Sequence, residues 1–107
     1  MTDSALSKII DVIVRTLDPD TIILFGSRAR GNAREDSNFD ICVLKNGIRE
    51  RRPVARKLYR ALYGIGAPVE LIVETPDTFS KFKDNPHLIY REIARYGKVI
   101  YEKSHAG

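Results

Sequence analysis

The chain has 107 residues, of which 43% are hydrophobic and 30% charged. This length allows one domain with a modest core, assigned here to residues 1–107, and this composition excludes a disordered chain. The net charge of +4 suits a phosphate-bearing partner without identifying one. No apolar run approaches the roughly 20 residues that cross a bilayer, and the first residues lack the pattern of a signal peptide. We therefore expect a cytoplasmic protein without membrane contacts.

The first half of the chain predicts a helix followed by two strands. Apolar residues at helical spacing predict a helix over 6–17, which Asp18-Pro19 ends. A short β-branched run, 21–25, predicts a strand buried on both faces. The polar segment 26–37 contains a Gly-Ser turn and a short helical stretch, and 39–44 predicts the second strand.

The second half predicts three helices and two strands. A helix with Pro53 in its first turn ends near Gly64 or Gly66, and 69–73 predicts a strand. Two short helices over 75–82 and 86–96 and an edge strand at 99–101 complete the elements. This order predicts an α+β fold, in which helices pack on a small mixed sheet.

The single cysteine and the two histidines indicate no metal centre of their own. Cys42 excludes an internal disulfide and a cysteine-based zinc site, and its apolar neighbours predict a small buried side chain. His87, expected in a first helical turn, and His105, in the tail, have no companion at ligand spacing.

The turn after the first strand can hold phosphate. Gly26 has no Cβ, so its backbone can approach a bulky anion closely, and Ser27 offers a hydroxyl and a backbone N–H to phosphate oxygens. A helix that begins here would add outward-facing amides.

Polar residues on the next two strands can hold a cation. Asn38 and Asp40 are two residues apart, which places them on one face of a strand. Glu70 interrupts the apolar third strand, where a buried lone carboxylate would be costly. We expect Glu70 beside Asp40 at a cation such as Mg²⁺, which prefers oxygen ligands. The alternative is that Asp40 caps a loop and Glu70 pairs with a surface arginine.

These motifs resemble those of a known family. The segments 26–31, 36–41 and 69–73, and the ending 96–102, are similar to the minimal nucleotidyltransferases of the DNA polymerase β-type superfamily. The resemblance covers nearly the whole chain and implies the polymerase β-like nucleotidyltransferase fold. It also implies transfer of a nucleoside monophosphate from ATP or another nucleoside triphosphate, with Mg²⁺.

The resemblance implies roles for individual residues. Ser27 would hold the terminal phosphates, and Asn38 and Asp40 would be paired metal ligands. Glu70 would match the third carboxylate, which helps to activate the acceptor hydroxyl. The arginines at positions 28 and 30 would neutralise phosphate charge, or one of them would only cover the surface.

The chain departs from the family pattern at two positions, since the family has Asp in place of Asn38 and usually in place of Glu70. Glutamate keeps the charge, whereas the amide of Asn38 loses it. A unit charge at 4 Å is worth about 4 kcal/mol at an effective dielectric of 20. The sequence therefore leaves two functions open: a weakened enzyme, or a catalytically impaired nucleotide-binding antitoxin.

Partners follow from the same resemblance. Such proteins are often paired with a helical HEPN-type toxin, and the nucleotidyltransferase then resembles an antitoxin that adds AMP to a tyrosine of its partner. The shortness of the chain also suggests an acceptor protein or a homo-oligomer.

A basic run follows the second strand, and its cations are Arg49, Arg51, Arg52, Arg56, Lys57 and Arg60. Helical spacing places most of them opposite the apolar stripe, so we favour a solvated face over an RNA or acidic-partner surface. No RNA-binding motif accompanies them, and nucleic acid is not an expected partner. The tyrosines at 59, 63, 90, 96 and 101 are expected to pack half-buried.

Overall fold

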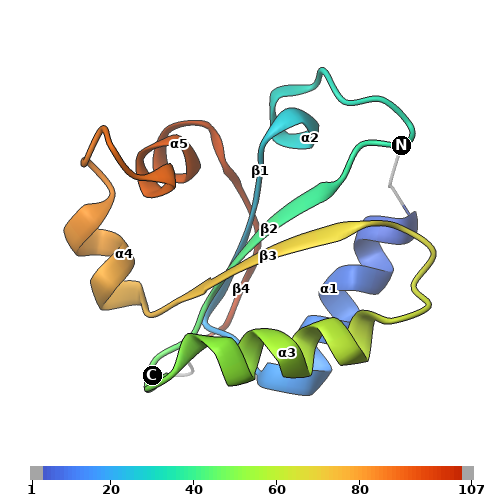
Figure 1. The fold of residues 1–107 in the computed structure, drawn as a ribbon, viewed down its shortest axis with the longest axis horizontal. Coiled ribbons are helices and arrows are strands. Elements are labelled where there is room, and N and C mark those ends of the chain that lie inside the picture. Colours follow the sequence, from blue (N-terminus) through green and yellow to red (C-terminus); the bar gives the residue numbers. More distant parts are fainter. Residues whose placement is uncertain (1–3, 105–107) are drawn as a thin grey trace.

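Four strands and five helices follow one another in the computed structural model, which describes residues 4–104. The elements are α1 (Ser4–Leu17), β1 (Thr21–Phe25), α2 (Ser27–Arg30), β2 (Phe39–Leu44), α3 (Arg51–Leu62), β3 (Val69–Glu74), α4 (Pro76–Phe82), α5 (Ile89–Tyr96) and β4 (Lys98–Glu102). The α+β fold predicted from the sequence is confirmed (Figure 1).

The strands form one mixed sheet in the order β3-β2-β1-β4. β1 is antiparallel to both β2 and β4, whereas β2 and β3 are parallel. The C-terminal end of β1 and the N-terminal ends of β2, β3 and β4 therefore lie at the same end of the sheet. The register places Phe25 of β1 opposite Asp40 of β2, and Asp40 opposite Glu70 of β3.

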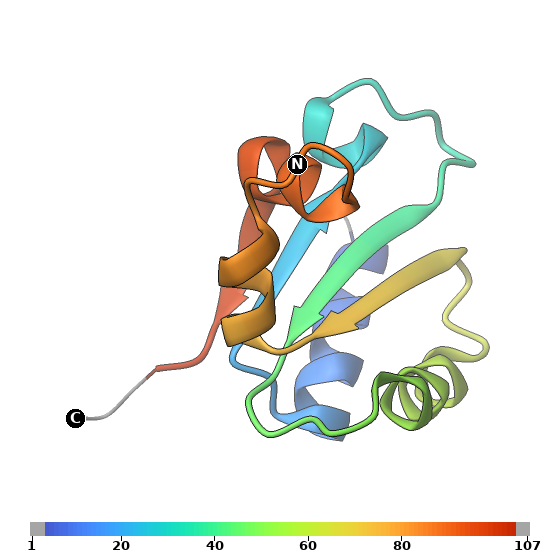
Figure 2. The same ribbon diagram turned by 60° about the vertical axis from the view of Figure 1, so that its left-hand side comes forward.

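Helices cover both faces of the sheet, α1 and α3 on one side and α4 and α5 on the other (Figure 2). Alternation along β2 divides its side chains between the two layers. Phe39, Ile41 and Val43 pack with the α1 and α3 residues, while Cys42 and Leu44 pack with Tyr90 and Ile93 of α5. β1 and β2 are consequently apolar on both faces, as expected for central strands.

Local sequence signals explain the ends of the short helices. Thr75 caps α4, because its hydroxyl accepts the Thr78 backbone N–H at 3.2 Å and Pro76 occupies the first turn. Gly97 ends α5, and a Cβ there would overlap Ile93 and Ile23.

Two details differ from the sequence prediction around α5. The helix begins at Ile89 rather than at 86, because the Asn85 side chain and carbonyl accept the backbone N–H groups of His87 and Leu88 in a turn. His87 therefore lies in this turn and is exposed. His105 lies outside the described residues.

Burial confirms one side-chain prediction and overturns another. Cys42 is fully buried, as expected, and burial raises the pKa of its thiol to about 12. Tyr63, however, is 93% exposed, so the half-buried packing expected for it is wrong; it is the first residue after α3. Tyr59 and Tyr96, at 45% and 52% exposure, are half-buried as expected. The cations of the basic run are exposed, as predicted.

No helix in the described part of the chain is long and apolar enough to span a membrane.

Candidate active site

The turn between β1 and α2 lies directly against a carboxylate. Gly26 has φ 72° and ψ −155°, a backbone conformation that side chains rarely allow. A Cβ at this position would overlap Oδ2 of Asp40. The absence of a side chain at Gly26 therefore lets the Asp40 carboxylate approach the turn, as the register of β1 and β2 requires.

Asp40 and Glu70 lie side by side on neighbouring parallel strands. The side chains of Asp40 and Glu70 lie on the sheet face that α4 and α5 cover. Cys42 and Ile72, two residues later on the same two strands, share that face and pack against these helices. Burial and the negative charge and hydrogen bond of Glu70, followed by the charge of Glu92, raise the pKa of Asp40. The adjacency predicted from the sequence is present, and within residues 4–104 neither Asp40 nor Glu70 forms an ion pair.

Asn38 is exposed and lies one residue before β2 begins. The chain is tied here to the start of β3, because the Phe39 backbone N–H donates to the Pro68 carbonyl at 2.9 Å. Alternation places the Asn38 amide toward the Asp40 side of the strand. Its carbonyl oxygen can ligate a metal, but it brings no charge.

Ser27 opens the four-residue helix α2 and is half-buried. The helix is closed at its other end by Gly31, whose left-handed conformation favours glycine. Gly26 and Ser27 thus form the junction of β1 and α2, at the end of the sheet where Asp40 lies. The Ala29 and Arg30 backbone N–H groups both donate to the Gly26 carbonyl at 3.1 Å, so this turn offers an anion chiefly the backbone N–H and hydroxyl of Ser27.

The two arginines of this segment have different surroundings. The Arg28 guanidinium lies 3.8 Å from the centroid of the Phe39 ring and donates to the Ser37 and Glu35 carbonyls. Phe39 and Asp40 point to opposite faces, so this guanidinium braces the loop 31–38 from the other side of the sheet. The structure does not bring Arg28 to the carboxylates.

Arg30 lies on the side of Asp40. Its guanidinium pairs with Glu92 of α5 at 3.0 Å and lies 4.6 Å from the Tyr96 ring centroid. Glu92 in turn adds to the negative charge felt by Asp40. A hollow of about 260 Å³ adjoins Glu92 and Tyr96. Of the two arginines, Arg30 is therefore the one on the carboxylate side of the sheet, with its guanidinium paired to Glu92.

Three residues of this face escaped the sequence analysis. Glu92 and Tyr96 lie on α5, and no motif in the sequence connects that helix to the turn at Gly26. Glu74 is a buried carboxylate on the same face of β3 as Glu70. Its even spacing from Glu70 was a detectable signal, because residues two and four apart share a face.

The donor set suits Mg²⁺. Asp40 and Glu70 supply carboxylate oxygens, and Asn38 adds an amide oxygen. Burial and then the negative charge of Glu70 raise the pKa of Asp40, and a cation would offset that charge. Within residues 4–104, no three His, Cys, Asp or Glu side chains converge as a metal cluster. Mg²⁺ is usually held by one or two carboxylates together with substrate phosphates.

The fold and the arrangement of turn and carboxylates define a class, the polymerase β-like nucleotidyltransferase domains. A family model described as polymerase beta, nucleotidyltransferase matches residues 7–106. The chain is also 32% identical to MJ1305 of Methanocaldococcus jannaschii, named a candidate protein adenylyltransferase, over 96% of this chain and 76% of that protein. The chain therefore belongs to the polymerase beta nucleotidyltransferase family, as its motifs predict.

Solved toxin–antitoxin complexes contain chains with the same fold. A chain of a toxin–antitoxin structure with AMP-PNP has a TM-score of 0.61 and 24% identity, over 91% of this chain and 73% of that chain. A chain of a MntA–HpeT variant has a TM-score of 0.66 and 17% identity, over 96% and 75%. These likenesses confirm the fold predicted from the sequence.

Proposed function

We propose that this protein transfers a nucleoside monophosphate, AMP from ATP in the first instance, to a hydroxyl group of a protein or small molecule. One observation carries the proposal: Gly26 permits the Asp40 carboxylate to lie against the phosphate-binding turn while Glu70 lies beside it. Family membership and the relative named as a protein adenylyltransferase support the same reaction class.

The residues divide the work as follows. The Gly26 backbone and the Ser27 hydroxyl bind the terminal phosphates, and Arg30 offsets part of their charge. The Glu70 carboxylate accepts the proton of the acceptor hydroxyl. The hydroxyl oxygen then bonds to the α-phosphorus, the bond to the β-phosphate oxygen breaks, and pyrophosphate leaves. Arg28 keeps the loop 31–38 in place behind this site.

Magnesium is the cofactor that this site fits. Asp40 and Glu70, with the Asn38 amide, would hold it, and bound Mg²⁺ would neutralise phosphate charge and stabilise the leaving pyrophosphate. The missing charge at Asn38 predicts weak metal affinity and slow transfer.

The direct test is transfer of label from α-labelled ATP to candidate acceptor proteins, with Mg²⁺ or Mn²⁺. We expect labelled acceptor with the wild-type protein, none with Asp40→Asn, and none after chelation of the metal. Asp36→Asn is the matched control, because Asp36 undergoes the same chemical change in the exposed loop that precedes β2. Equal labelling by the Asp40→Asn and wild-type proteins would overturn the proposal.

A second function is favoured by Asn38 and by the toxin–antitoxin structures that share this fold. In this alternative the chain binds a helical HEPN-type toxin and masks it without chemistry. The substitution Asn38→Asp separates the two functions. Transfer that rises at least tenfold supports an enzyme limited by one ligand, whereas unchanged toxin inhibition with no transfer in either protein supports binding alone.

A further inference from the structure

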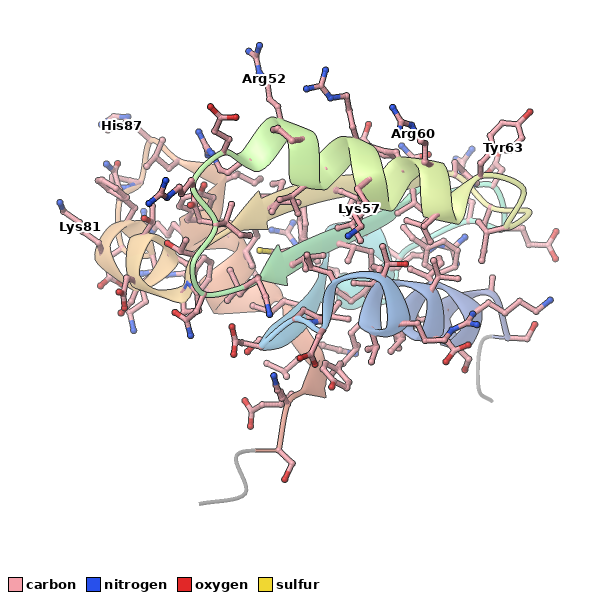
Figure 3. The ribbon with its side chains drawn as sticks, turned by 90° about the horizontal axis from the view of Figure 1, so that it is seen from below. Arg52, Lys57, Arg60, Tyr63, Lys81 and His87 are labelled. Atoms are coloured by element: carbon pink, nitrogen blue, oxygen red, sulfur yellow. The ribbon has the colours of Figure 1, made fainter. Side chains whose placement is uncertain are left out.

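α3 presents one stripe of cationic and aromatic side chains to solvent. Leu58 and Leu62 are its buried residues. At 100° per residue, five residues lie about 100–200° around the helix from Leu58 and form one stripe. These stripe residues are Arg52, Arg56, Tyr59, Arg60 and Tyr63, the last of which is the residue after the helix. Figure 3 shows Arg52, Arg60 and Tyr63 projecting from α3 away from the sheet.

The cations of the stripe have no acidic partner in the part of the chain that the structure describes. α3 contains no Asp or Glu, and its single ion pair there joins Arg51, outside the stripe, to Glu74. Arg52, Arg56 and Arg60 are spaced four residues apart, so like charges are neighbours on the helix surface and repel one another. Positive charge is therefore concentrated on this helix without being offset.

Two tyrosines accompany these arginines. Tyr63 is 93% exposed, and its ring is the most exposed large apolar surface among the described residues. Tyr59 is held in place, because its hydroxyl accepts the Leu71 backbone N–H at 2.8 Å. Together with Arg56 and Arg60, the two tyrosines line an open hollow of about 470 Å³.

We propose that the α3 stripe binds single-stranded nucleic acid, with Arg52, Arg56 and Arg60 on phosphates and Tyr63 and Tyr59 against bases. Cations alone would fit any acidic partner. The combination of a cationic row with a fully presented aromatic ring matches the two components of a single strand, its phosphates and its stacking bases. The sequence-based preference for a plain solvated face rested on helical spacing and on the absence of an RNA-binding motif, and it did not count on an exposed aromatic ring beside the cations, which Tyr63 provides.

The stripe is separate from the candidate active site. α3 packs on the sheet face of Phe39 and Ile41, whereas Asp40 and Glu70 belong to the opposite face. The proposal therefore does not depend on whether the chain transfers nucleotides.

Fluorescence anisotropy of labelled 12-nucleotide RNA and DNA single strands tests the proposal. We expect saturable binding at low salt that weakens with a slope of about −0.7 in log affinity against log salt for each phosphate contacted. The RNA and DNA arms identify which nucleic acid the stripe prefers. Blunt duplexes of the same length should bind more weakly, because their bases are not free to stack.

Matched variants locate the binding surface. Arg56→Gln/Arg60→Gln should weaken binding by about tenfold or more and lower the salt slope by about 1.4. Lys8→Gln/Arg15→Gln removes two exposed cations from α1 and should change binding little more than the net charge requires. Tyr63→Ala should weaken binding about fivefold or more, while Tyr63→Phe keeps the ring and should bind like the wild type.

Three results would overturn the proposal. The first is no binding of either single strand at low salt. The second is equal weakening by the α1 and α3 double variants, which would make binding a matter of net charge. The third is saturable binding of a labelled polyglutamate peptide with no binding of RNA or DNA, which would assign the stripe to an acidic protein. Circular dichroism of each variant confirms that these exposed substitutions leave the fold intact.

Discussion

β3 carries two glutamates on one face, Glu70 and Glu74, and the two side chains have opposite surroundings. Glu74, 5% exposed, accepts hydrogen bonds from Arg51 at 3.1 Å, from the Thr75 backbone N–H at 3.0 Å and from the Tyr90 hydroxyl. Glu70, four residues earlier, is exposed and lies beside Asp40, which is also negative. Within residues 4–104 it forms no ion pair.

The difference separates a structural carboxylate from a functional one. A buried carboxylate is tolerated when donors surround it, and Glu74 uses its donors to join α3, β3 and α5. Two adjacent carboxylates repel each other, and the pKa of Asp40 is raised by its burial first and by the charge of Glu70 second. Groups left in such an arrangement are candidates for binding a ligand.

The largest effect should come from Gly26→Ala. Its backbone conformation, φ 72° and ψ −155°, is essentially restricted to glycine and costs another residue about 1–3 kcal/mol, and the new Cβ would also displace Asp40. We expect loss of nucleotide binding and a clear fall in the thermal midpoint, measured by calorimetry.

Gly31→Ala is the matched control for that substitution. Gly31 also has a positive φ, of 81°, but a Cβ there would meet no atom within 4 Å. It should lose about 1–2 kcal/mol of stability and retain nucleotide binding. Equal loss of binding in both variants would show that strain, rather than the Asp40 contact, explains the role of Gly26.

The two glutamates should respond in opposite directions to the same change. Glu74→Gln should cost about 1–3 kcal/mol in the free energy of unfolding, because it weakens bonds of a buried charged group. Glu70→Gln should leave the metal-free protein equally stable or slightly more stable, because it removes a negative charge beside Asp40. Urea unfolding at neutral pH measures both, and a larger loss with Glu70→Gln would contradict the comparison.

The dependence of folding stability on pH tests the pairing of Glu70 with Asp40 separately. Because the pKa of Asp40 is raised in the folded state, the metal-free protein loses stability as pH rises through that folded-state pKa. In Glu70→Gln this loss should be smaller, and added Mg²⁺ should reduce it in the wild type. Urea midpoints measured from acidic to neutral pH provide the check, and an unchanged loss in the variant would contradict it.

The buried Cys42, in the middle of β2, should have a smaller effect on the free energy of unfolding, and only at alkaline pH. Cys42 lies opposite Ile72, which stands between Glu70 and Glu74 on β3. Burial raises the pKa of its thiol from 9.0 to about 12 on folding. Above pH 9 the unfolded chain releases the thiol proton and the folded chain keeps it, so stability falls as pH rises. The expected cost is about 2 kcal/mol near pH 10.5. Cys42→Ala should show a shallower loss between pH 8 and 10.5, and an equal slope would refute the assignment.

Most of the fold could be predicted from the sequence because its signals are local. Apolar residues at helical spacing, runs of β-branched residues, and Gly and Pro at the ends of elements locate the helices and strands to within a few residues. The family motifs further predict that Asp40 and Glu70 come together. The start of α5 was misplaced because the turn at Asn85 depends on hydrogen bonds that periodicity does not reveal.

The remaining features of the site depend on tertiary packing. Arg28 and Arg30 are two residues apart on one short helix, yet one guanidinium lies on Phe39 and the other on Tyr96. The charge of Glu92 acts on Asp40 only because α5 packs against β1. The sequence did signal Glu74 through its alternation with Glu70, but only the structure supplies its donors.

The most direct measurement is calorimetric titration of the magnesium complex of α,β-methylene ATP, which binds without being transferred. The account predicts Mg²⁺-dependent binding to the wild type, binding at least about tenfold weaker to Asp40→Asn, and near wild-type binding to Glu74→Gln. Undiminished binding to Asp40→Asn, or an equal loss with Glu74→Gln, would contradict the claim that Asp40 and Glu70 form the nucleotide site.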